Sequence, residues 1–117
     1  MPTREQITTV VEAYVDAVGR QDIDAVLSLF AVDARQEDPV GSPVNTGDAI
    51  REFFERSFSG SFETALEEVL VNGDHTAFRF TITIPTKGDP MVVKVVDLAL
   101  INEDLKIQHL QAVPDFG

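Results

Sequence analysis

Apolar residues near the start of the chain recur at intervals of three and four positions. They are Ile7, Val10, Val11, Tyr14, Val15 and Val18. This spacing gathers them on one stripe of an amphipathic helix. Thr3 and Gln6 have the spacing of a capping box, which marks a helix start, and Gly19 lies near the expected end. We therefore predict a first helix between Thr3 and Gly19, with one face on the core.

Two further helices are predicted before residue 60. Asp22 is a suitable N-cap for a short second helix, whose apolar positions fall within residues 23–30. A third helix is predicted over residues 48–58. The segment between them, residues 31–47, contains two prolines that favour extended or turn geometry in the residues before them. We expect only a short strand at residues 35–38, followed by a loop.

The second half of the chain alternates apolar and polar residues, which is the pattern of strands. The Asn-Gly-Asp sequence at residues 72–74 is a strong hairpin signal between the first two of them. Further turns are predicted at residues 85–90 and 102–104, so the third strand spans residues 91–101 and the fourth spans residues 105–113. Three helices followed by four strands predict an α+β fold, in which the helices pack against one curved sheet and leave an open, apolar-walled cone.

Length and charge restrict the partners that such a fold can have. The 117 residues suit one domain, which is expected to span residues 1–117. Nine Lys and Arg residues against 20 Asp and Glu residues give a net charge of −11, which repels nucleic-acid phosphates and anionic membrane surfaces. The chain has no cysteine and no apolar run near the ~20 residues that cross a bilayer. We expect a cytoplasmic protein with no nucleic-acid partner and no membrane insertion.

One acidic residue, Asp97, lies inside the most apolar predicted strand. Alternation puts it on the same face as Val95 and Ala99, while Lys94 lies on the other face. An ionised carboxylate in such surroundings is costly, so a raised pKa and a protonated side chain are expected. A protonated carboxyl group can donate a hydrogen bond. A structural role, with the carboxyl bound by a loop backbone or by Arg79, stays open at this point.

Other polar residues are candidates for chemistry. Tyr14, the only tyrosine, lies on the apolar stripe of the first helix, where a core role is the simpler interpretation. Asp38 is held extended by the proline after it, and it either reaches a cavity as a base or stays a solvated turn carboxylate. His75 and His109 have no partner at metal-ligand spacing, so no metal site is expected.

Segments along nearly the whole chain resemble bacterial ketosteroid isomerases, which belong to the cone-shaped group of nuclear transport factor 2 and the polyketide cyclases. The matching segments are Tyr14-Val15, Gln21-Asp22-Ile23-Asp24-Ala25-Val26, Phe30-Ala31-Val32-Asp33-Ala34, Glu37-Asp38-Pro39-Val40-Gly41, Val95-Val96-Asp97-Leu98 and Lys106-Ile107-Gln108. A helix tyrosine, an acidic residue before proline and an aspartate in an apolar strand are together more specific than any one of them.

The resemblance implies an activity and a role for each of these residues. Asp38 would be the general base that moves the double bond of a Δ5-3-ketosteroid to Δ4, and Tyr14 and protonated Asp97 would both donate hydrogen bonds to the dienolate oxygen. No cofactor is implied, and the implied partners are a small hydrophobic, steroid-like substrate and a second copy of the chain, bound through the outer face of the sheet. Phe30 and Phe54 stand where isomerases of this family carry further tyrosines. The expected substrate-binding wall consists of Val18, Phe54, Phe78, Phe80, Val95, Leu110 and Ala112.

Other functions stay open from the sequence. Another enzyme of the cone-shaped group, such as a polyketide cyclase, also uses one aspartate as acid and base. An epoxide hydrolase would need an Asp–Arg–Asp arrangement around a water molecule, for which Arg79 is the candidate. A non-catalytic module that binds a hydrophobic ligand or only dimerises would fill the cone with its own side chains.

Overall fold

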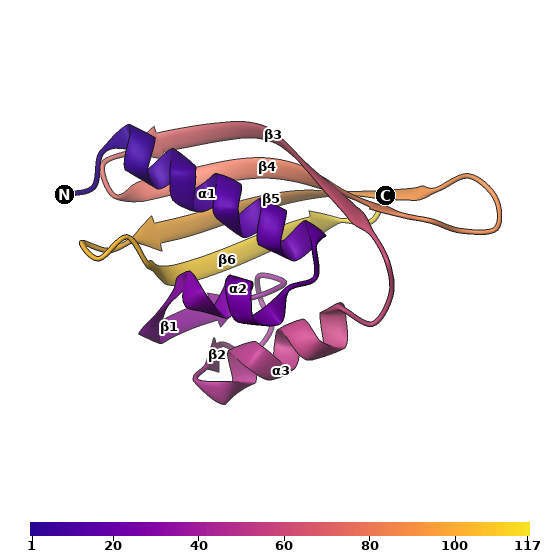
Figure 1. The fold of residues 1–117 in the computed structure, drawn as a ribbon, viewed down its shortest axis with the longest axis horizontal. Coiled ribbons are helices and arrows are strands. Elements are labelled where there is room, and N and C mark those ends of the chain that lie inside the picture. Colours follow the sequence, from indigo (N-terminus) through magenta and orange to yellow (C-terminus); the bar gives the residue numbers. More distant parts are fainter.

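The computed structural model describes residues 1–117 and has three helices on one side of a six-stranded sheet (Figure 1). In chain order the elements are α1 (Arg4–Gly19), α2 (Ile23–Ser28), β1 (Phe30–Glu37), β2 (Asn45–Thr46), α3 (Asp48–Ser57), β3 (Glu63–Asn72), β4 (His75–Ile84), β5 (Met91–Ile101) and β6 (Ile107–Asp115). The strand order is β2-β1-β6-β5-β4-β3, with β1 and β6 parallel and the other neighbours antiparallel. The predicted α+β fold, a curved sheet against three helices, is confirmed, and the sheet is mixed.

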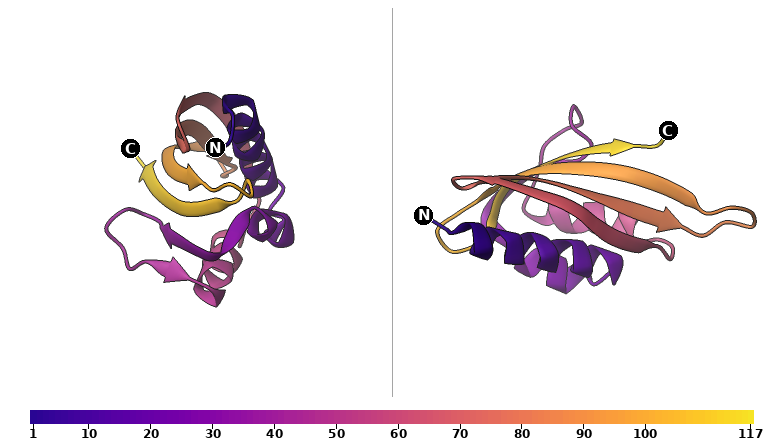
Figure 2. Two further views of the ribbon diagram at one scale, coloured as in Figure 1. Left: turned by 90° about the vertical axis from the view of Figure 1, so that its left-hand side faces the viewer. Right: turned by 90° about the horizontal axis from the view of Figure 1, so that it is seen from above.

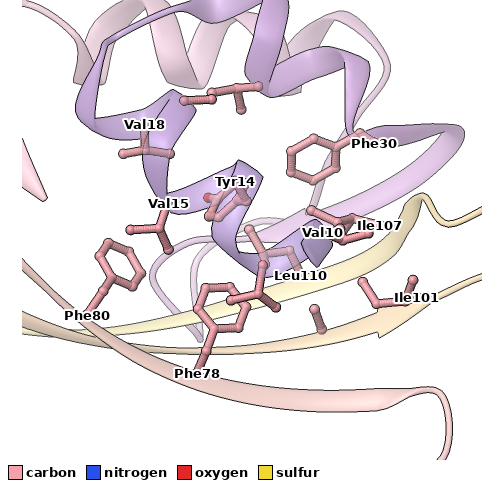
Figure 3. Close-up of a cluster of buried hydrophobic side chains, with 14 of the residues drawn as sticks. Val10, Tyr14, Val15, Val18, Phe30, Phe78, Phe80, Ile101, Ile107 and Leu110 are labelled. Atoms are coloured by element: carbon pink, nitrogen blue, oxygen red, sulfur yellow. The ribbon is translucent and has the colours of Figure 1, made fainter. Parts of the chain in front are cut away.

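Helix α1 forms where its capping residues and its apolar stripe predict it. The Gln6 amide donates to the Thr3 hydroxyl at 3.1 Å, and the Thr3 amide donates to the Gln6 side chain at 2.9 Å. These reciprocal bonds satisfy two N–H groups that the first turn would otherwise leave without partners. The buried face of α1 lies against the sheet, and Tyr14 points from it into the core between Phe30 and Phe78 (Figure 3).

The bounds of strands β1 and β6 differ from the prediction, because these two strands, far apart in the sequence, pair with each other. β1 begins at Phe30, a residue expected in the second helix, since residues 30–37 run parallel to β6. The sequence pattern does not predict the two-residue β2. β6 continues through Pro114, past its predicted end at residue 113. Proline is tolerated there because β1 accompanies β6 only as far as Gln111, which leaves this end of β6 at a sheet edge.

The sheet curves strongly and forms a half-open cone with the helices (Figure 2). Register shifts interrupt the β3–β4, β5–β6 and β1–β6 ladders, and such irregularities increase twist and bending. At the closed end, buried aliphatic side chains such as Ile7, Ile101 and Ile107 fill the core. At the other end β4 and β5 extend beyond the helices as a long hairpin (Figure 2). None of the three helices is both long enough and apolar enough to cross a membrane.

Candidate active site

The open end of the cone holds a largely apolar cavity of about 390 Å³ between α1, α3 and the sheet. Among the few polar residues that line it are Tyr14 from α1, Asp38 immediately after β1, and Asp97 from β5. These residues are far apart in the sequence, and the packing of the helices against the curved sheet brings them together. One cavity therefore contains all three residues for which the sequence predicts a chemical role.

The Asp97 side chain is almost completely buried, with an exposed fraction of 1%. Its neighbours on the adjacent strands are Phe78 on β4 and Ala112 on β6, both apolar. Its Oδ1 atom has no hydrogen-bond partner within the chain. Burial raises the pKa of Asp97 well above its ordinary value, and the charge of Asp38 raises it further. The Asp97 carboxyl is therefore protonated at neutral pH and carries an O–H group that can donate.

Arg79 does not neutralise Asp97. It lies on the outer face of β4, where its guanidinium is 3.7 Å from the Glu68 carboxylate on β3. Because alternate residues of a strand point to opposite faces, Arg79 is directed away from the cavity that Phe80 on β4 helps to line. The ion pair between Arg79 and Asp97 that the sequence left open does not form.

Tyr14 lies among aromatic rings. Its ring meets Phe30 and Phe78 edge to face, with centroid distances of 6.2 Å and 6.0 Å (Figure 3). Burial raises the pKa of the Tyr14 phenol well above its ordinary value; Asp97, once it ionises at higher pH, and the charge of Asp38 raise it further. The phenol therefore stays protonated. Phe30 and Phe54 have no hydroxyl group, so neither ring can hydrogen-bond to Tyr14.

Asp38 is half-buried at the side of the cavity. Burial raises the pKa of its carboxyl to about 6. A carboxylate with this pKa is still mostly ionised at neutral pH, and it is a stronger base than an ordinary aspartate. The cavity thus combines one ionised carboxylate with two protonated groups, a combination able to remove a proton and to stabilise the oxyanion that results.

Four of the seven predicted wall residues line the cavity, and these are Val18, Phe54, Phe80 and Val95. The other three are buried outside its lining, and these are Phe78, Leu110 and Ala112. Alternation predicts the face on which a strand residue lies but not its depth along the cone. Phe78 and Ala112 flank Asp97, and Leu110 lies two residue pairs further toward the closed end, opposite Ala99. All three side chains are buried next to the cavity lining and are not part of it.

Much of the cavity wall near the mouth was not predicted. The additional lining residues are Pro39, Phe53, Ser57, Phe58, Phe62, Ile82, Ile84, Val93, Pro114 and Phe116. Alternation along β4 puts Ile82 and Ile84 on the face of Phe80, and this signal was sufficient to find them. No local signal marks Phe62 or Phe116, because both lie outside regular elements and reach the cavity only through the tertiary fold.

The two histidines lie outside the cavity. His75 Nδ1 is 2.8 Å from the carboxylate of Asp74 in the β3–β4 turn. His109 is on β6, and its buried Nε2 atom has no hydrogen-bond partner. The structure contains no cluster of three or more side chains suited to holding a metal ion.

A half-open cone of mixed sheet around an apolar cavity is the architecture of proteins like nuclear transport factor 2. The profile of the SnoaL-like domain family matches residues 11–110. This chain therefore belongs to the SnoaL-like domain family, and within that group it is ketosteroid-isomerase-like, because one relative is a steroid isomerase.

That relative is the steroid Delta-isomerase of Nocardioides simplex, which is 32% identical over 108 residues, covering 92% of this chain and 88% of the relative. Among solved structures, the epoxide hydrolase/cyclase-like enzyme SalBIII, which acts in pyran ring formation in the polyether salinomycin, matches with a TM-score of 0.84. The match covers 98% of this chain and 95% of SalBIII at 24% identity. At that identity the likeness to SalBIII shows the shared fold alone.

Proposed function

We propose that this protein is a steroid Δ5-isomerase, which moves the double bond of a Δ5-3-ketosteroid to Δ4. The observation that carries the proposal is the meeting of Asp38, Tyr14 and Asp97 in one apolar cavity, with Asp97 kept protonated by its burial. The curated relative named as a steroid Delta-isomerase supports the reaction class. A neutral and apolar substrate suits a wall that contains no basic residue.

The reaction is a proton transfer in two steps. The Asp38 carboxylate removes a proton from the carbon between the ketone and the alkene, and the electron pair of that C–H bond moves into a dienolate. Tyr14 and protonated Asp97 donate hydrogen bonds to the oxygen as its negative charge develops. Protonated Asp38 then returns the proton to the far carbon of the dienolate, which yields the conjugated ketone and restores the starting state of the enzyme.

Electrostatic stabilisation of the dienolate accounts for much of the expected rate. A donor that is fixed in a dry site and aimed at a developing oxyanion contributes about 3 kcal/mol to lowering the barrier, so two donors are a large effect. A positioned base contributes a further ~10²–10⁴-fold. Burial serves both groups, because it raises the pKa of Asp38 into the range of an efficient base and keeps Asp97 able to donate.

The direct test is to incubate the protein with a β,γ-unsaturated 3-ketosteroid and follow the ultraviolet absorbance of the conjugated enone. We expect kcat/KM to fall about tenfold per pH unit below about 6, because Asp38 acts only when ionised. At alkaline pH activity should fall again as Asp97 ionises and loses its donor. Absence of enone at every pH would reject the proposal, and activity that is independent of pH near 6 would reject Asp38 as the base.

The same assay separates the isomerase from the other functions that fit this fold. An epoxide hydrolase with an Asp–Arg–Asp centre is disfavoured, since Arg79 lies on the outer face of the sheet with Glu68. A polyketide cyclase would use Asp38 but would not convert the unsaturated ketosteroid. A module that only dimerises would fill the cone with its own side chains, whereas this cone retains a cavity of about 390 Å³.

We also propose that the protein is a homodimer, joined through the outer face of the sheet. Large hydrophobic side chains are exposed there on β5 and β6, and they are Val92, Val96, Leu98 and Val113. They lie on the face opposite Asp97, where none of the three helices covers the sheet (Figure 2). An uncovered apolar sheet face of this kind favours association with a second copy.

Charged substitutions on this face test the dimer. Size-exclusion chromatography with light scattering at micromolar concentration should give twice the chain mass for the natural protein. The double variant Val96→Lys/Leu98→Lys should give a monomer, because it places like charges in the contact. Val32→Lys, at a fully exposed valine on β1, is the matched control and should remain dimeric. A monomeric natural protein would contradict the proposal.

A further inference from the structure

The loop that carries Asp38 is fastened to β6 at two neighbouring residues. The Val40 amide donates to the Ala112 carbonyl at 2.8 Å. The Gln111 side-chain amide donates to one oxygen of the Glu37 carboxylate at 3.1 Å. Asp38 lies between Glu37 and Val40, so both ends of the short segment that carries it are held on the same strand.

The Glu37 carboxylate also closes the loop on itself. Its second oxygen accepts a hydrogen bond from the Gly41 amide at 2.8 Å. Gly41 has a φ of +96°, a backbone conformation that L side chains rarely adopt, and a glycine can hold it without strain. One carboxylate thus receives donors from the loop and from β6, and hydrogen bonds to an ionised acceptor are stronger than those between neutral groups. Both bonds lower the pKa of Glu37 below its ordinary value, so the carboxylate is ionised.

The attachment to β6 matters because β6 is also the strand that pairs with β5 at Asp97. Ala112 on β6 is paired with Asp97 on β5, and Glu37 on β1 is in register with Gln111. Residues 111 and 112 therefore link the loop of the base to the strand of the proposed oxyanion donor.

We propose that Glu37 is a positioning residue for Asp38, whose carboxylate ties the loop of residues 37–41 to β6 and so holds the base over the cavity. This inference rests on the proposed isomerase function. Glu37 does not line the cavity and takes no proton from the substrate. Its effect is on geometry, and small displacements of a catalytic group can lower a rate by about 10²-fold.

Three variants test the role of Glu37. Glu37→Leu removes both acceptor oxygens and should lower kcat by about 10- to 100-fold with little change in KM. Glu37→Gln loses the charge but can still accept from Gly41 and donate to a reoriented Gln111 amide, so it should retain most of the activity. Glu12→Leu, at an exposed glutamate on α1 with no side-chain hydrogen bond, is the matched control and should behave as the natural protein.

Two readouts separate positioning from a general structural effect. The affinity for a naphthol, a phenol that resembles the dienolate, should be the same in Glu37→Leu and in the natural protein, because Tyr14 and Asp97 are not disturbed. The pKa of Asp38, followed by carbon-13 NMR of its carboxyl, should fall from about 6 toward an ordinary value in Glu37→Leu as the loosened loop becomes hydrated. In Glu37→Gln it should remain near its starting value.

The outcomes also separate this inference from the proposed function. If the natural protein converts the ketosteroid and Glu37→Leu has an unchanged kcat, Glu37 does not position the base. If kcat and naphthol affinity fall together in Glu37→Leu, its role is general stability and the inference is wrong. If the natural protein has no isomerase activity, the proposed function is wrong. The pKa of Asp38 then still reports whether Glu37 holds the loop. A lower Asp38 pKa in Glu37→Leu supports the inference, and an unchanged pKa overturns it.

Discussion

Asp38→Asn should lower kcat by up to about 10⁴-fold, because it removes the base and preserves the shape of the side chain. The variant should still bind an analogue of the dienolate. If the analogue binds as an anionic phenolate, its affinity should be higher than for the natural protein. The Asp38 charge raises the pKa of both Tyr14 and Asp97, which means that it opposes negative charge near them. Removing that charge therefore favours an anion in the cavity. Enone absorbance measures the first effect, and a fluorescence titration with a naphthol measures the second.

Asp33→Asn is the matched control for this substitution. Asp33 lies on the same strand, β1, but is exposed and accepts a hydrogen bond from Gln108 at 2.9 Å, which asparagine can also accept. It should leave both the rate and the naphthol affinity unchanged. Full turnover by Asp38→Asn would show that another group takes the proton, and loss of naphthol binding would show that Asp38 is needed to maintain the cavity.

Asp97→Leu should lower activity while it stabilises the fold. Loss of one oxyanion donor costs about 10²–10³-fold in kcat. The stability gain arises because a buried carboxyl with an unpartnered oxygen is replaced by an apolar side chain in apolar surroundings. Activity should decrease from the natural protein through Asp97→Asn, which keeps an N–H donor, to Asp97→Leu. The free energy of unfolding is measured by urea titration.

The pH dependence of the free energy of unfolding tests directly whether Asp97 is protonated in the folded protein. In the unfolded chain Asp97 ionises near its ordinary pKa of about 3.9, whereas in the folded protein burial keeps it protonated. The folded state then binds more protons, so the free energy of unfolding falls as pH rises above about 4. Asp38 likewise makes the free energy of unfolding fall with rising pH, between its ordinary pKa and about 6. Asp97→Leu should remove the part of this slope that continues above pH 6, and an unchanged slope would show that Asp97 ionises normally.

Local patterns predict the parts of the site that depend on local geometry. Capping residues and helical spacing place Tyr14 on the buried face of α1. Alternation in β5 places Asp97 on the inward face, and its apolar neighbours in the sequence predict its burial and raised pKa. The convergence of Tyr14 and Asp97 with Asp38 does not follow from these patterns, and only the family resemblance predicts it.

The features that escaped prediction depend on contacts between distant segments. The parallel pairing of β1 with β6 joins residues more than 70 positions apart, so the full length of β1 has no local signal. The same pairing brings Gln111 to Glu37, which is why the fastening of the Asp38 loop is visible only in the fold. Depth along the cone is equally non-local, and it separates Phe78 from Phe80 although both lie on the same face of β4.

The single tyrosine of this chain has a practical consequence. The chain has no tryptophan, so Tyr14 is its only strong near-ultraviolet fluorophore, and that ring lines the cavity. Intrinsic emission is therefore dominated by one known position, because the eight phenylalanines emit only weakly. A molecule that enters the cavity and contacts the phenol changes the surroundings of the dominant emitting group, which allows occupancy to be followed without any label.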